Sequence, residues 1–221
     1  MIAWSMVGAA YAGGLAVGVG VGVVKDMPDA HARFGVGPTL QIPVRYEIAP
    51  RAFLRVDLQA AFATGHDRLT WGREIDGAEV RFYSDDHWSL VASGALMVGA
   101  DVMLPDDLPV YVGVQAGLGM IGNYHALGGT SAAVLLDPDQ NDIGDTGNID
   151  PSSMAIVPVS ALHVGALLPI GDGLDLWGEV GYTVAFLGAK PLTKTPSGLG
   201  ATREPFGWNP LRVVVGVSFG G

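Results

Sequence analysis

The stretch Leu-Ala-Val-Gly-Val-Gly-Val-Gly-Val, residues 15–23, alternates strictly between a large apolar residue and a small one. A period of two is typical of a β-strand, because successive side chains of a strand point to opposite faces. The pattern therefore predicts a strand over residues 13–24. It also raises the question of which face of that strand is buried.

Two other interpretations compete for the uncharged segment 1–24. A secretory signal peptide begins with a basic region, which is missing here, although Ala10-Tyr11-Ala12 resembles a cleavage site. A transmembrane helix needs about 20 apolar residues, but each glycine in the segment would weaken a helix by about 1 kcal/mol relative to alanine. We favour the strand and expect residues 1–12 to be an N-terminal segment, either a truncated export signal or a periplasmic lead-in.

The same alternation recurs in further segments along the chain, and each predicts another strand. With the first segment they make eight strands. The seven further segments are 34–47, 52–64, 88–103, 110–121, 155–168, 175–187 and 211–219.

The connections between these segments alternate in length. Tight turns occupy 48–51, 105–109 and 169–174, whereas 65–87, 122–154 and 188–210 are long. Antiparallel strands that cross a bilayer emerge alternately on its two sides, and bacterial outer-membrane barrels have short turns on one side and long loops on the other. The rhythm predicts that both chain ends lie on the short-turn, periplasmic side.

The two faces of each strand differ in chemistry. In segment 52–64, Leu54, Val56 and Leu58 alternate with Arg55 and Asp57. Elsewhere the second face is mostly Gly, Ala, Ser and Gln, which is too poor in charge for the surface of a soluble barrel but suits a narrow lumen. We therefore predict an all-β fold over residues 13–221, an eight-stranded antiparallel up-and-down transmembrane β-barrel with its large apolar face in lipid.

Composition agrees with this prediction. The 221 residues are 49% hydrophobic and only 15% charged, with 33 Gly and 14 Pro, and beyond residue 24 no uncharged apolar run is long enough for a membrane helix. Cysteine is absent, which excludes disulfides and thiol chemistry, and the net charge of −10 argues against nucleic acid as a partner.

The chain resembles the small outer-membrane β-barrel proteins, the group of the OmpA membrane domain, OmpX and OmpW. The resemblance rests on the strand count, the loop rhythm and the terminal Val-Val-Val-Gly-Val-Ser-Phe, residues 213–219, although Gly220 and Gly221 follow the final aromatic residue. It implies localisation in the bacterial outer membrane, contact with membrane lipid and lipopolysaccharide, and recognition of the carboxy-terminal strand by the barrel-assembly machinery.

Aromatic residues near strand ends on the apolar face predict the interfacial girdle of a membrane barrel. The predicted girdle residues are Phe34, Tyr46, Phe62, Trp88, Phe186 and Phe219.

Two prolines of opposite parity, Pro38 and Pro43, suggest a bulge in the second strand.

Charged residues share the small, polar face. Buried charges must be paired, so they predict either a salt-bridge plug in a narrow lumen or a path for ions or protons, and we favour the plug. His163 has the same parity. The predicted lumen network comprises Arg45, Glu47, Arg55, Asp57, Asp101, Asp175, Glu179 and Arg212.

Two long loops carry further signals. The loop 122–154 has five aspartates and no Lys or Arg, and its oxygen-bearing residues alternate as at the start of a calcium-binding loop, although the glycine and the final glutamate of that motif are missing. Asp76-Gly77, between two alternating runs, predicts a hairpin that protrudes beyond the membrane. The candidate calcium ligands are Asp137, Asp139, Asn141 and Asp145.

These features predict an anchoring barrel whose lumen is plugged and whose long loops mediate surface interaction or envelope integrity. The first alternative is a narrow channel or transporter for ions or small apolar molecules, and the second is a lipid-modifying barrel enzyme. No zinc-spaced histidine pair or serine–histidine–acid arrangement is evident in the sequence. We therefore do not expect an enzyme, and apart from the candidate calcium we expect no cofactor.

Overall fold

The computed structural model describes residues 14–27, 32–75, 78–104, 109–125, 134–136, 142–145, 153–186, 192–194, 200–202 and 208–220. The predicted N-terminal segment 1–12 lies outside these residues. The strands are β1 Leu15–Asp26, β2 Ala32–Phe34, β3 Val36–Ala49, β4 Ala52–Ile75, β5 Ala78–Met103, β6 Val110–His125, β7 Val134–Leu136, β8 Asp142–Asp145, β9 Ser153–Gly171, β10 Leu174–Ala185, β11 Leu192–Lys194, β12 Gly200–Thr202 and β13 Pro210–Gly220.

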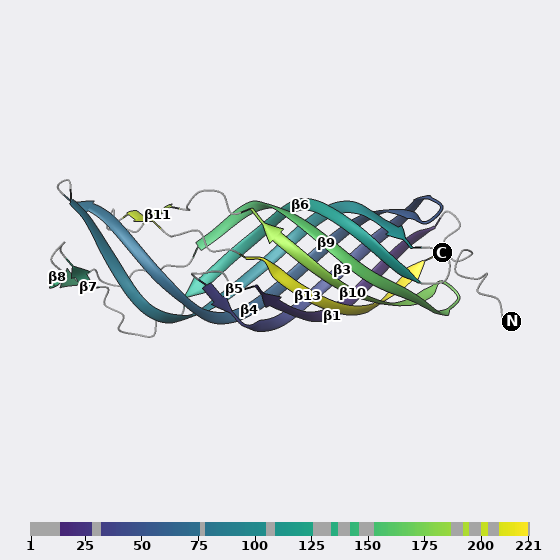
Figure 1. The fold of residues 1–221 in the computed structure, drawn as a ribbon, viewed down its shortest axis with the longest axis horizontal. Helices are drawn as coiled ribbons and strands as arrows, with labels where there is room; N and C mark the ends of the chain where they lie inside the picture. Colours follow the sequence, from purple (N-terminus) through teal and green to yellow (C-terminus); the bar gives the residue numbers. More distant parts are fainter. Residues whose placement is uncertain are drawn as a thin grey trace.

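Eight long strands form a closed antiparallel ring in the order β4-β3-β1-β13-β10-β9-β6-β5, which the pairing of β5 with β4 completes. The strands are tilted relative to the long axis of the barrel (Figure 1). The first and last long strands close the seam, with Ala16 opposite Gly220 and Asp26 opposite Pro210. The predicted eight-stranded barrel is confirmed. No helix long and apolar enough to span a membrane occurs in the part of the chain that the structure describes.

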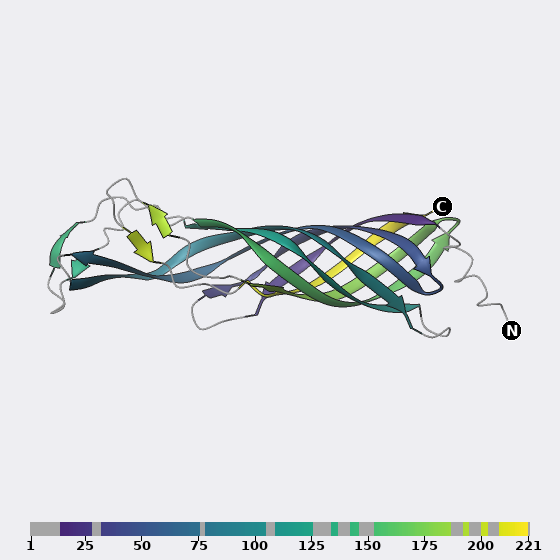
Figure 2. The ribbon, with the colours of Figure 1, turned by 90° about the horizontal axis from the view of Figure 1, so that it is seen from above.

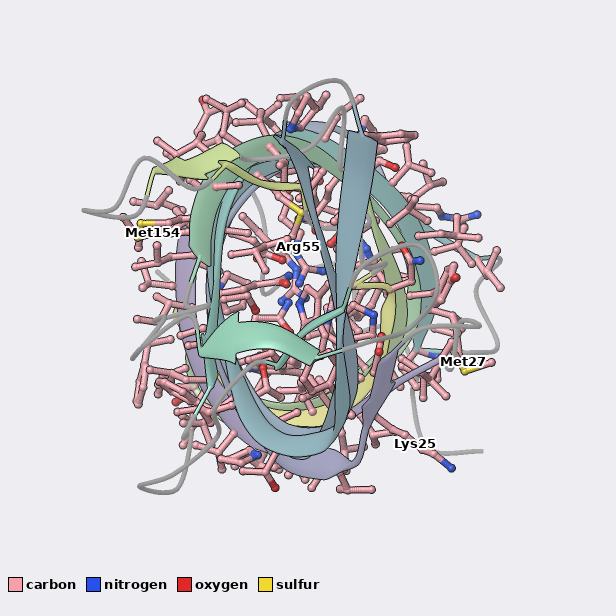
Figure 3. All side chains as sticks on the ribbon, turned by 90° about the vertical axis from the view of Figure 1, so that its left-hand side faces the viewer. Lys25, Met27, Arg55 and Met154 are labelled. Atoms are coloured by element: carbon pink, nitrogen blue, oxygen red, sulfur yellow. The ribbon has the colours of Figure 1, made fainter. Side chains whose placement is uncertain are left out.

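The large apolar residues face outward, as predicted from the low charge of the face of small residues. Leu58 is 54% exposed and Val114 58% exposed, whereas their neighbours Asp57 and Gln115 are buried inside the ring. Side chains viewed along the barrel axis form an outer shell that is mostly carbon, with Arg55 in the middle of the ring (Figure 3). In β1 the outward apolar residues run from Leu15 to Val23, which is about the length that a tilted strand needs to cross a bilayer.

The prediction for Phe34 is wrong, because its side chain lies inside the barrel and is only 5% exposed. The segment predicted as one strand is divided at Gly35, whose N–H donates to the carbonyl oxygen of Thr64 at 2.7 Å. Gly35 and Val36 are both exposed, so the alternation is reset there and Phe34 turns inward. Its ring meets that of Trp208 edge-on, with the ring centroids 5.9 Å apart.

The remaining girdle candidates that the structure describes face outward. Tyr46 and Phe219 are exposed near the short-turn end, and Phe62 and Phe186 are exposed toward the loop end. The side chain of Trp88 lies outside the described residues. These positions match the two interfacial levels at which aromatic residues gather in membrane barrels.

The bulge predicted from Pro38 and Pro43 is not present. The register of β3 with both neighbours is constant through this stretch, so Pro38 faces outward and Pro43 inward within one regular strand. Pairing with β1 is interrupted between Val44 and Gln41. Proline has no N–H to donate, so a gap in the ladder replaces the expected bulge.

The predicted hairpin is confirmed as far as Ile75 and Ala78, and Asp76-Gly77 between them lies outside the described residues. Strands β4 and β5 stay paired as far as Ile75 and Ala78, although β6 follows β5 only to Ser89. The paired strands project beyond the rim of the ring, at the end opposite the C terminus (Figure 1, Figure 2). The short strands β7 and β12 approach the flanks of β5 and β4, respectively.

Candidate functional site in the barrel lumen

Arg55 is the centre of a network of buried charges. It lies on β4 with inward parity and is fully buried. Its Nε and Nη2 donate to the two carboxylate oxygens of Asp57, each at 2.9 Å. Its Nη1 lies 2.6 Å from Oε2 of Glu179 and 3.1 Å from Oδ2 of Asp101. One guanidinium therefore contacts carboxylates from three strands, β4, β5 and β10.

Two further arginines extend the network across the lumen. Arg45 Nε donates to Oδ2 of Asp101 at 3.0 Å, and Arg45 Nη2 lies 3.9 Å from Oε2 of Glu179. Arg212 Nη2 donates to Oε1 of Glu179 at 3.0 Å. Three guanidinium groups thus face three carboxylates, so the paired charges of this core balance.

Uncharged and titratable partners complete the contacts. Tyr111 donates its hydroxyl to Glu179 at 2.9 Å, and Gln41 Nε2 donates to Asp57 at 2.8 Å. His163 Nε2 lies 2.7 Å from Oδ1 of Asp101. With a proton on Nε2, His163 donates a hydrogen bond to this carboxylate. The sequence places His163 on the same face as the network, whereas Gln41 and Tyr111 were not assigned to it, although their inward parity was the available signal.

The other two acids predicted for the network lie near the short-turn ends of their strands. Glu47 is half-buried, and Asp175 is buried near the short-turn end of β10. Neither contributes a contact described above. Alternation gives the face of each residue but not its height along the barrel, and that height decides which groups it meets.

Glycines in the wall make room for the large side chains inside. A Cβ on Gly113 would overlap the carboxylate of Asp101 and the ring of His163. A Cβ on Gly181 would lie 2.7 Å from Cζ of Arg212. The small residues that alternate with valine are therefore part of the site, because the charged groups fill the space that they leave.

Gly18 and Gly20 of β1 leave room for Trp177, whose buried ring has its centroid 5.8 Å from Cζ of Arg45. A Cβ on Gly20 would come within 2.5 Å of Cζ2 of Trp177. We expect Gly20→Ala to lower the free energy of unfolding by about 1–3 kcal/mol, because the ring has to move in a packed interior. Urea unfolding in lipid vesicles measures the change.

Gly178→Ala is the matched control for that substitution. Gly178 lies on the outward parity of β10, and the atom nearest to its added Cβ would be 3.9 Å away. The same methyl group should therefore be tolerated there. Equal losses at Gly20 and Gly178 would contradict the packing role of Gly20.

A small cavity lies on the loop side of the network. Its volume is about 30 Å³, and its lining includes Arg212, Thr183 and Ser93. Trp208 also lines it, is 2% exposed, and donates its indole N–H to Oγ of Ser93 at 3.1 Å. Trp208 was not predicted, because it stands in a stretch without alternation. Apolar side chains fill much of the lumen at this level, among them Val24, Phe34, Ala61, Val91, Ile121, Val159 and Ala185.

The candidate calcium ligands Asp137, Asp139 and Asn141 lie outside the described residues. Asp145 is described only as the last residue of β8. Within the described part of the chain, no group of histidine, aspartate and glutamate side chains is arranged to hold a metal ion. Calcium binding stays a prediction.

No protein-family model and no curated protein sequence matches the chain. Among solved structures, the chain is similar to the outer membrane protein OprG of Pseudomonas aeruginosa, with 13% identity, a TM-score of 0.52, and 96% of this chain and 97% of OprG covered. A major outer membrane protein of Thermus thermophilus matches with 19% identity, a TM-score of 0.48 and coverage of 95% and 100%. Ail of Yersinia pestis, solved with a heparin analogue, matches with 10% identity, a TM-score of 0.47 and coverage of 95% and 99%.

At these identities the comparison concerns the fold. The chain has the fold of the small outer-membrane β-barrels, as the sequence predicts. The outward apolar band agrees with a place in the outer membrane.

Proposed function

We propose that the chain is a non-conducting anchor of the outer membrane that holds its long hairpin and loops at the cell surface for interaction with an external partner. The observation that supports this proposal most directly is the set of arginine–carboxylate contacts that crosses the lumen around Arg55.

The energetics of these contacts argue against a path for ions. An ion passing Arg55 would have to separate guanidinium and carboxylate groups that are withdrawn from water, and breaking a buried pair costs about 3–5 kcal/mol. On the loop side, the side chains around Trp208 line a cavity of about 30 Å³. An eight-stranded barrel is just wide enough for its side chains to fill.

The hairpin supports the display part of the proposal. On the hairpin side of Ser89, β5 no longer pairs with β6. The strands β4 and β5 remain paired up to Ile75 and Ala78. The loop 122–154, with five aspartates and no Lys or Arg, adds negative charge on the same side. A partner with basic groups would suit this surface better than a phosphate-bearing one. Lipopolysaccharide reached through divalent cations is a further proposed partner.

Planar-bilayer recording tests the closed lumen. We expect the purified protein, inserted in molar potassium chloride, to give no regular conductance steps, because the buried pairs stay formed. Insertion is verified separately by heat-modifiable migration on gels of the same sample. Steady unitary steps from correctly folded protein would rule out a plugged lumen.

Epitope insertion tests whether the hairpin of β4 and β5 lies at the cell surface. We expect an epitope placed between Asp76 and Gly77 to bind its antibody on intact cells, because that turn joins the ends of the protruding strands. The control is the same epitope between Asp172 and Gly173, in the turn between β9 and β10, which should be labelled only after permeabilisation. The reverse pattern would show that the proposed orientation is wrong.

A further inference from the structure

The cavity between Arg212 and Trp208 has a lining of unusual chemistry. Arg212 is the only charged residue that lines it, among the residues that the structure describes. The other lining residues are apolar or carry hydroxyl or amide groups. The carboxylates of the network do not line the cavity, although Glu179 accepts from Arg212 Nη2 at 3.0 Å.

Besides the amide of Gln59, which donates to Asp57 at 3.3 Å, three groups at this cavity have a proton that no contact described above uses. Nε of Arg212 has no hydrogen-bond partner in the described part of the chain, although the residue is 2% exposed. Thr183 Oγ1 accepts from Arg212 Nη1 at 2.8 Å, and Ser93 Oγ accepts from Trp208 Nε1 at 3.1 Å. Each hydroxyl is therefore left with its own proton to donate.

A third hydroxyl group at the cavity, that of Thr39, is already engaged as a donor. Thr39 also lines the cavity, but its hydroxyl donates to the carbonyl oxygen of Ala60 at 3.0 Å. Its proton is already used. Thr39 and Thr183 are thus chemically identical side chains at one cavity, of which only Thr183 can donate into it.

We propose that this cavity is a binding site for a monovalent anion of halide size. The donors converge from β5, β10 and β13, and a buried guanidinium N–H without a partner is costly in an apolar setting. A volume of about 30 Å³ accommodates a guest of roughly the size of one water molecule. The ion would lie under the indole of Trp208, whose movement would give access from the loop side.

A water molecule could satisfy the same donors, and the experiment distinguishes the two guests. Bromide quenches tryptophan fluorescence on contact, so bromide is titrated into the detergent-solubilised full chain in a halide-free gluconate buffer. A bound bromide gives a saturable component of quenching in addition to the linear collisional one. We expect that component in the wild type and expect it to be absent in Trp208→Phe.

The threonine pair provides the matched variants. Thr183→Val should weaken the saturable binding about tenfold or more, because a hydrogen bond to a charged group is lost. Thr39→Val should leave it unchanged within about twofold. If Thr183→Val does not fold, Ser93→Ala makes the same prediction from the opposite wall.

Strictly linear quenching of the folded wild type would overturn the proposal, as would equal effects of Thr183→Val and Thr39→Val. Crystals grown with bromide give an independent measurement. An anomalous peak within hydrogen-bond distance of Arg212 Nε supports the anion site. Density for water alone at that position overturns it.

Discussion

Replacing Arg55 with methionine is expected to lower the free energy of unfolding by about 3–5 kcal/mol, because it strands buried carboxylates. Arg55 is in contact with Asp57, Asp101 and Glu179 and is fully buried. The substitution leaves two arginines facing three carboxylates in a medium of low polarity. Urea unfolding of the protein in lipid vesicles, monitored by tryptophan fluorescence, measures the change.

The double variant Arg55→Met with Asp57→Asn is the informative control. It leaves Arg45 and Arg212 facing Asp101 and Glu179, so the number of positive and negative groups is again equal. We expect the double variant to be more stable than Arg55→Met alone, although it has lost more hydrogen bonds. Such a result is the mark of coupled charges. A double variant that is as unstable as the sum of two independent losses would contradict the network.

The faces of the strands could be predicted from the sequence because a strand has a period of two. That period places Arg55 and Asp57 on one face and Leu58 on the other, and the low charge of the face of small residues assigns that face to the lumen. Phe34 was assigned to the wrong face because one exposed residue, Gly35, resets the alternation between β2 and β3. A local irregularity of this kind leaves no clear trace in composition, since glycine is frequent throughout the chain.

The partners inside the barrel could not be predicted, because they depend on how the strands are staggered. Arg55 and Glu179 are 124 residues apart in sequence and meet across the lumen. Their contact depends on strand tilt and register, which alternation does not contain. Trp208 poses a different difficulty, because its place in the lumen follows from the last long connection and not from a strand pattern.

An arginine at Leu58 is expected to lower the free energy of unfolding by about 2–4 kcal/mol, because it would put a charge into the apolar band. Leu58 is 54% exposed on the outer face of β4, and its strand neighbours Ile42 and Leu96 continue that band. A partly exposed leucine on a soluble protein would tolerate the same change with little loss, within about 0.5 kcal/mol. The size of the effect in vesicles therefore tests whether this face contacts lipid.

Gln59→Arg is the matched variant, one residue further along the same strand. Gln59 faces the lumen and donates to Asp57 at 3.3 Å, so a guanidinium there would have a carboxylate within reach. We expect a smaller loss than at Leu58, reduced by that pairing and increased by crowding. The alternation that begins at Leu15 is compatible with either face being buried, since a soluble barrel would show the same period with the large residues inside. Equal losses of stability for Leu58→Arg and Gln59→Arg would mean that the outer face is not in lipid. A larger loss for Leu58→Arg would show that the face of large apolar residues contacts the membrane.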